Sequence, residues 1–138
     1  MPDQPTDDVD VEVLVVDDQP QFLGAAREVI DATAGFHTAG SAMSADAAVH
    51  WLETGAADIV VMDVRMPGKD GVEAARALAR RRDRPVVVLC STDERPDIAA
   101  DPAAHGADAF YRKERFVATL LREVWKEFGA ARRPLVGP

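Results

Sequence analysis

Five polar side chains come directly or shortly after apolar segments of the sequence, and their chemistry suits a phosphate group. They are three aspartates, a serine and a lysine: Asp17, Asp18, Asp63, Ser91 and Lys113. Three carboxylates brought together repel one another, and a divalent cation relieves that repulsion. Mg²⁺ prefers oxygen ligands, keeps several of its waters and commonly joins carboxylates to phosphate. A carboxylate beside such an ion can attack phosphorus, while a lysine and a hydroxyl bind the remaining phosphoryl oxygens.

These side chains can meet only if the apolar segments form neighbouring strands of one sheet. Strand-like segments are followed by segments of helical periodicity five times along the chain. The expected strands are 11–16, 36–42, 59–62, 86–90 and 106–111. The expected helices are 20–35, 44–55, one from about 71, a short or irregular one within 91–104, and one over about 114–128. Apolar strands alternating with amphipathic helices predict an α/β fold with a doubly wound, five-stranded parallel sheet. Ligands of such sheets bind beyond the carboxyl ends of the strands, where the five polar side chains would lie.

Composition narrows the class of protein further. The 138 residues predict one domain, and a net charge of -8 with a pI near 4.8 argues against direct contact with nucleic acid. No apolar run approaches the roughly 20 residues that span a bilayer, so no membrane association is expected. The acidic first ten residues do not resemble a signal peptide, and the single cysteine, Cys90, fits a reducing compartment. We therefore expect a cytoplasmic protein.

With these residues in place, the chain from Val11 to Phe128 resembles the response-regulator receiver family of two-component signalling. The resemblance is carried by the acidic pair Asp17-Asp18, the hydroxyl cluster after the fourth expected strand, and two longer stretches. Those stretches are Asp-Val-Arg-Met-Pro-Gly-Lys-Asp-Gly at 63–71 and Gly-Ala-Asp-Ala-Phe-Tyr-Arg-Lys at 106–113. The family resemblance implies a flavodoxin-like (βα)5 fold and bound Mg²⁺.

The resemblance also implies roles for individual residues. Asp63 stands at the position of the phosphoacceptor, and Lys113 at that of the lysine that pairs with the phosphoryl group. The implied metal ligands are Asp17, Asp18, Asp63 and the backbone carbonyl of Arg65. Phe110 stands where the family has its aromatic switch residue.

The position of the hydroxyl group is open. Counting back from Gly106 and Lys113 gives Ser91, whereas counting forward from Pro85 gives Cys90. A thiol is a weak hydrogen-bond donor, so Ser91 makes better chemical sense.

Three features depart from the pattern of the family or qualify it. Glu114 follows Lys113 where many members have proline, which affects the backbone of the last loop. Pro102 interrupts the fourth helical region, which is the usual switching surface of the family. Arg65 and Thr92 flank the expected phosphoryl site, and we hypothesise that their bulk hinders attacking water and prolongs the life of the phosphoryl group.

The resemblance implies a function and a set of partners. A sensor histidine kinase or a histidine phosphotransfer protein would supply the phosphoryl group to Asp63, and the change would switch partner binding. The downstream partner would be an effector protein or an output domain absent from this chain. A homodimer could form through the segment 96–105, the fifth strand and the last helix. We expect a flexible leader at 1–10, a receiver at 11–128 and a tail or truncated linker at 129–138, too short for a DNA-binding helix-turn-helix.

Two other functions fit parts of the pattern. An aspartate-dependent phosphohydrolase would need a second aspartate as general acid, but Val64 and Arg65 follow Asp63. A receiver-like adaptor that binds its partner without phosphate would not need the acidic pair, Asp63 and Lys113 together. The proposed module is thus a phosphoacceptor rather than an enzyme acting on a separate substrate, although it catalyses its own phosphorylation and dephosphorylation.

Overall fold

The chain forms one parallel sheet covered by helices on both faces. The computed structural model describes residues 10–68 and 70–129. Five strands pair in the order β2-β1-β3-β4-β5, all of them parallel. Their bounds are Val11–Val16 (β1), Phe36–Ala42 (β2), Ile59–Asp63 (β3), Val86–Ser91 (β4) and Ala109–Arg112 (β5). The predicted α/β class and the five-stranded parallel sheet are confirmed.

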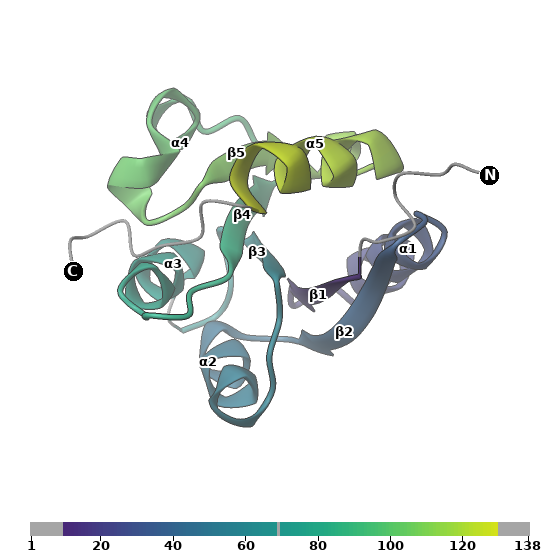
Figure 1. The fold of residues 1–138 in the computed structure, drawn as a ribbon. Coiled ribbons are helices and arrows are strands. Elements are labelled where there is room, and N and C mark those ends of the chain that lie inside the picture. Colours follow the sequence, from purple (N-terminus) through teal and green to yellow (C-terminus); the bar gives the residue numbers. More distant parts are fainter. Residues whose placement is uncertain (1–9, 69, 130–138) are drawn as a thin grey trace.

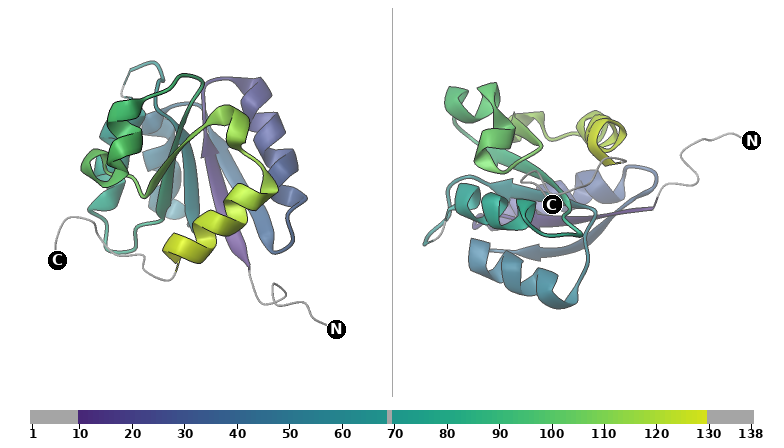
Figure 2. Two further views of the ribbon diagram at one scale, coloured as in Figure 1. Left: turned by 90° about the horizontal axis from the view of Figure 1, so that it is seen from above. Right: turned by 60° about the vertical axis from the view of Figure 1, so that its left-hand side comes forward.

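The helices form two layers, one on each face of the sheet (Figure 1). Their bounds are Pro20–Asp31 (α1), Ala45–Thr54 (α2), Gly71–Ala79 (α3), Pro96–Ala100 (α4) and Ala118–Phe128 (α5), with 3-10 turns at Pro102–His105 (η2) and Lys113–Arg115 (η3). Helices α1 and α5 contact each other on one face, whereas α2 and α3 cover the opposite face, as the views in Figure 2 show. The expected leader at 1–10 and tail at 129–138 lie outside the described residues, except for Asp10 and Gly129.

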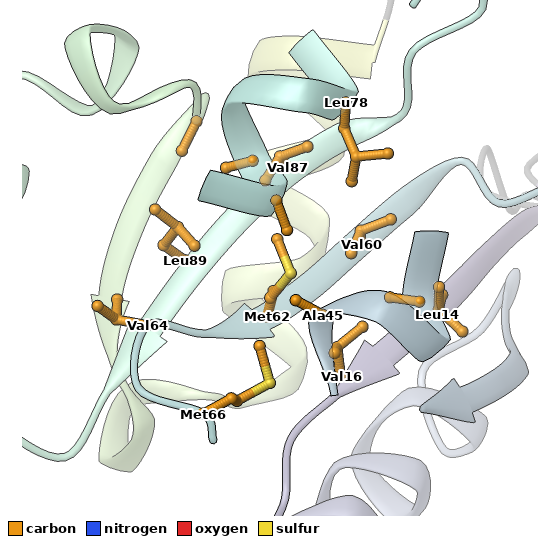
Figure 3. Packing of buried hydrophobic residues seen from close by; sticks show 14 of the residues in the cluster. Leu14, Val16, Ala45, Val60, Met62, Val64, Met66, Leu78, Val87 and Leu89 are labelled. Carbon is orange, nitrogen blue, oxygen red and sulfur yellow. The ribbon is translucent and has the colours of Figure 1, made fainter. Parts of the chain in front are cut away.

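Successive strand residues send their side chains to opposite faces, and each face has its own core. Leu14, Val60 and Val87 point toward α2 and α3, where they pack with Leu78 in the cluster of Figure 3. The alternate strand residues pack against α1 and α5 and include Val13, Val61, Val88 and Cys90. Because both faces are covered, the central strands are buried along their length, which explains their continuous apolar sequence.

Helix starts follow the capping signals of the sequence. Ser44 accepts a hydrogen bond from the Ala47 N–H at 3.0 Å, as an N-cap serine should. Asp70 caps α3 and forms a reciprocal pair with Glu73, in which each side chain accepts from the other's backbone N–H. This capping box fixes where the segment after Asp63 becomes helical.

Element boundaries near the C-terminal third differ from expectation. The fifth strand begins at Ala109 rather than 106, because Gly106 takes a left-handed conformation with φ of 81° and ends the preceding 3-10 turn. The last helix begins at Ala118 rather than about 114, because the chain makes the separate turn Lys113–Arg115 and is extended at Phe116. Helix α4 ends at Ala100 and Pro102 begins the separate turn η2, which confirms the expected short and irregular helix.

The first helix ends at Asp31, four residues before the expected end at Gly35. The Thr33 hydroxyl donates to the Val29 carbonyl at 2.7 Å, and the Thr33 N–H bonds the Ile30 carbonyl in a tighter turn. These local bonds replace helical ones at the end of α1.

Candidate functional site

Three carboxylates meet at the carboxyl edge of the sheet. Strands β1 and β3 are neighbours, and Asp17 follows β1 while Asp63 is the last residue of β3. One oxygen from each of Asp17, Asp18 and Asp63 lies within 4.8 Å of the others. Asp17 is fully buried, Asp63 is 8% exposed and Asp18 is half-buried. The sheet order therefore brings together three aspartates that the sequence places at two different strand ends.

Lys113 reaches this group from the turn after β5. Its Nζ lies 2.6 Å from Asp17 Oδ2 and 3.5 Å from Asp63 Oδ2. The Lys113 ammonium also lies 3.5 Å from Gln19 Oε1 and 4.9 Å from the centre of the Phe22 ring. The side chain is only 9% exposed, so the ammonium is largely removed from water.

The electrostatics of the edge are unbalanced, with three carboxylates against one ammonium. Burial and then the charge of Asp17 raise the pKa of Asp63, although Lys113 and the Arg65 N–H act in the opposite direction. Burial acts to lower the pKa of Lys113, but the hydrogen bond to Asp17 and the two carboxylate charges together raise it. The carboxylates therefore keep Lys113 protonated, and the remaining negative charge still favours a second cation.

The donor set fits a hard divalent cation. All three acidic groups offer carboxylate oxygens, and Asp18 borders an open hollow of about 390 Å³ with Arg65 and Met66. Such a cation accepts oxygen ligands together with water, and the hollow leaves room for that water. Asp17 Oδ1 accepts the Gln19 N–H at 2.8 Å, which fixes the orientation of this carboxylate.

The loop after Asp63 is shaped around its carboxylate. The Arg65 N–H donates to Asp63 Oδ1 at 3.3 Å. Gly71 begins α3 directly against the strand, because a Cβ at this position would collide with the Asp63 carbonyl. The glycine that ends the Met-Pro-Gly-x-Asp-Gly run is therefore required by close packing behind the acidic site.

Cys90 and Ser91 point to different faces of the sheet. Cys90 is buried in the core below α1 and α5, and burial raises the pKa of its thiol to about 12. Ser91 ends β4, is 3% exposed, and its Oγ accepts the Asp93 N–H at 3.0 Å. The Cys90 thiol is thus buried in the core, but Cys90 is also the register partner of Asp63, and the charges of Lys113, Asp63 and Asp17 act on its thiol.

Phe110 lies on β5, two strands away from Asp63. Its half-buried ring packs against the core that α2 and α3 cover. With Tyr111, Pro96 and Ala99 it also lines a surface hollow of about 510 Å³. Phe110, the expected switch residue, therefore contacts both the core and the surface hollow.

Two arginines join loops around the site, and no local sequence pattern indicates either contact. Arg65 Nη2 lies 3.7 Å from Asp93 Oδ2, which connects the loop after β3 to the loop after β4. Arg112 donates to the Thr92 carbonyl at 3.1 Å and so connects β5 to the same loop. These contacts join residues 20 to 28 positions apart, which local patterns do not reveal.

A second group of ligating side chains lies near the start of β1. Asp10, Glu12 and His37 also bring one ligand atom each within 4.8 Å of the others. His37 Nε2 lies 2.8 Å from Asp10 Oδ1, and both side chains are more than half exposed. This contact is an exposed pair that joins the residue before β1 to β2, the strand beside β1 in the sheet.

Known proteins resemble this chain in both sequence and fold. The pattern of the response regulator receiver domain matches residues 13–124. The response regulator UvrY of Escherichia coli strain K12 is 36% identical over 119 residues, which are 83% of this chain and 54% of UvrY. The transcriptional regulatory protein PdtaR of Mycobacterium tuberculosis strain H37Rv is 31% identical over 121 residues, which are 85% of this chain and 58% of PdtaR.

Solved structures give the same result. The signal receiver domain of the response regulator NarL from Mycobacterium tuberculosis superposes with a TM-score of 0.74 at 27% identity, covering 84% of this chain and 97% of that one. A LuxR-family two-component response regulator from Aurantimonas sp. SI85-9A1 gives a TM-score of 0.75 at 26% identity, covering 90% of this chain and 88% of that one. The fold and its acidic edge define a signalling receiver, a module that accepts phosphoryl groups.

The chain belongs to the response regulator receiver domain family of two-component signalling. The chain spans about half the length of the two curated relatives. Within residues 10–68 and 70–129, the helices lack the length and apolar character that crossing a membrane would require.

Proposed function

We propose that Asp63 accepts a phosphoryl group from a sensor histidine kinase or a histidine phosphotransfer protein, in a reaction that depends on Mg²⁺. The observation that carries the proposal is the convergence of Asp17, Asp18 and Lys113 on Asp63 at the end of β3. An Asp63 oxygen attacks phosphorus, the bond from phosphorus to the donor imidazole nitrogen breaks, and the nitrogen keeps the electron pair. The product is an acyl phosphate on Asp63.

The other side chains have distinct proposed roles. Asp17, Asp18, Asp63 and the Arg65 carbonyl would hold Mg²⁺, whose charge would offset that of the phosphoryl oxygens. Lys113 pairs with one phosphoryl oxygen, because its ammonium already lies 3.5 Å from the attacking carboxylate. These groups act by position and charge, which is the main source of catalysis in phosphoryl transfer.

Ser91 is proposed as the hydroxyl that bonds another phosphoryl oxygen. Its placement at the end of β4 supports this role, and a hydroxyl bonds phosphoryl oxygens better than the thiol of Cys90, the register partner of Asp63. Phosphorylation adds about 1.5 to 2 negative charges and new acceptor oxygens. Ser91 moves toward them, and Phe110 turns inward to fill the space that Ser91 leaves.

The proposed output surface consists of α4, η2, β5 and α5. Phe110 and Tyr111 line the hollow of about 510 Å³ at this surface, so a change of the Phe110 rotamer alters its shape. The surface would bind a downstream effector, an output domain or a second copy of the chain. Residues 11–128 form the receiver unit in this proposal, and phosphorylation shifts its equilibrium between two conformations.

Incubation with acetyl phosphate and Mg²⁺, read by intact-protein mass, tests the phosphoacceptor. We expect one phosphoryl adduct that requires Mg²⁺ and is absent in Asp63→Asn. A folded wild-type protein that forms no adduct would contradict the proposal and favour an adaptor that binds without phosphate. Partner binding that is equal with and without phosphate would contradict the proposed switch.

A further inference from the structure

In the part of the chain that the structure describes, four groups lie near the Lys113 ammonium, and two of them come from the start of α1. Asp17 and Asp63 are carboxylates, at 2.6 Å and 3.5 Å. Gln19 contributes its amide oxygen at 3.5 Å, and Phe22 places its ring centre 4.9 Å away. The carboxylates already have roles in the proposed chemistry. The amide and the ring at the start of α1 do not.

We propose that Phe22 is a positioning residue for Lys113, and this role rests on the proposed function of Asp63 as phosphoacceptor. The face of an aromatic ring attracts an ammonium through its quadrupole, without carrying a net charge. Phe22 therefore holds the cation in place and adds no negative charge beside an incoming phosphoryl group.

Lysine needs such support at this site. Its ammonium is a point charge at the end of a flexible four-carbon stem, so its position depends on what surrounds it. Asp17 and Asp63 hold it now, but carboxylate oxygens that bind a divalent cation or phosphorus are less available to the ammonium. The contacts to Gln19 and Phe22 do not depend on those oxygens.

The Phe22 ring is itself held by the protein. It packs edge-to-face on Phe116 of the segment before α5, with ring centres 5.9 Å apart and planes at 60°. It also joins the core between the sheet, α1 and α5, as a half-buried side chain. Because Lys113 is only 9% exposed, its attraction to the ring is weakly screened by water.

The experiment compares three variants of the full chain by their rate of phosphorylation with acetyl phosphate and Mg²⁺. Phe22→Leu removes the ring but keeps an apolar side chain, and it should slow phosphorylation about fivefold. Phe22→Tyr keeps the ring and should restore the rate to within about twofold of wild type. Val29→Ala weakens the same core further along α1, and its rate should match that of wild type. Thermal unfolding of each variant shows that it is folded.

A double-mutant cycle separates positioning from packing. In a Lys113→Met background, Phe22→Leu should no longer slow phosphorylation, because the ring then has no cation to hold. Affinity for beryllofluoride, a phosphoryl mimic, gives a second readout and should fall in Phe22→Leu but not in Val29→Ala.

Each other outcome overturns the proposal. If Phe22→Leu is phosphorylated as fast as wild type, or Val29→Ala is equally slow, the ring has no positioning role while the phosphoacceptor stands. If the loss persists in the Lys113→Met background, the ring acts through something other than the lysine. If the wild type forms no adduct, the phosphoacceptor function fails, and the positioning role fails with it.

Discussion

Replacing Asp63 by asparagine should stabilise the folded protein in metal-free buffer while it abolishes phosphorylation. The Asp63 carboxylate is 8% exposed and lies within 4.8 Å of Asp17 and Asp18 at their ligand oxygens. One ammonium, that of Lys113, lies 3.5 Å away. Asparagine keeps the shape of the side chain and removes one of the three negative charges.

The size of the effect follows from these distances. At an effective dielectric constant of about 20, two unit charges 4.8 Å apart repel by about 3.5 kcal/mol, and opposite charges 3.5 Å apart attract by about 4.7 kcal/mol. Two carboxylate neighbours therefore outweigh one ammonium by about 2 kcal/mol, and solvent around half-buried Asp18 reduces this difference. We expect Asp63→Asn to gain about 1 to 2 kcal/mol at neutral pH, or roughly 4 to 8 °C in Tm.

The gain should depend on pH in a defined direction. Folding raises the pKa of Asp63 above its ordinary value of 3.8, through burial first and the charge of Asp17 second. The folded protein then binds this proton more tightly than the unfolded chain, so wild-type stability falls as pH rises from 3.8 through the raised value. The advantage of Asp63→Asn should be full at pH 7 and should shrink as pH falls toward 3.8.

Thermal unfolding of wild type and Asp63→Asn at several pH values is the assay. Glu28→Gln, which removes an exposed carboxylate on α1, should leave the Tm unchanged. Mg²⁺ should raise the Tm of wild type and narrow the gap between the two proteins. The electrostatic reasoning is refuted if Asp63→Asn is less stable than wild type at pH 7 without metal.

Three further predictions concern a buried ion pair at the amino ends of β4 and β5 and the residues around the site. Arg84→Ala should cost about 3 to 5 kcal/mol in urea unfolding, because the buried Asp108 carboxylate loses its cation, now bound bidentately at 2.8 and 3.0 Å, and, among the residues described, keeps only the Val87 N–H. A loss below about 1 kcal/mol would contradict this. Arg65→Asn combined with Thr92→Ala should speed loss of the phosphoryl group, measured as decay of the mass adduct, and an unchanged rate would refute the idea that their bulk excludes water. Phe110→Ala should keep phosphorylation but weaken phosphate-dependent partner binding, and binding that responds to phosphate as in wild type would contradict the switch.

The fold could be predicted because its strongest signals are local. The apolar strands 11–16 and 86–90 are buried on both faces, and a strand of that kind has no other stable place in a domain of this size. Capping residues such as Ser44 and Asp70 mark helix starts within a few positions. The convergence of the acidic residues then followed from one general property of parallel sheets, whose carboxyl ends share an edge.

The boundaries that were wrong lie where tertiary contacts decide the backbone. Gly106 is left-handed, and a Cβ there would lie 2.6 Å from the Arg76 backbone nitrogen, so packing on α3 sets where the fifth strand can begin. The end of α1 depends on the hydroxyl bond of Thr33, which competes with the helix only in this context. A periodic pattern does not contain either contact.

The surroundings of Lys113 show the same limit at the site itself. The lysine could be assigned from the residues before it, but its contact with Gln19 joins positions 94 apart. That contact exists because α1 starts at Pro20, three residues after Asp17, so the segment that supplies the metal-binding aspartates in our proposal also supplies Gln19 and Phe22 to the lysine. Substitutions in the first turn of α1 should therefore act on the chemistry at Asp63 as well as on packing, and this first turn is where we expect the phosphorylation rates of otherwise similar receivers to diverge.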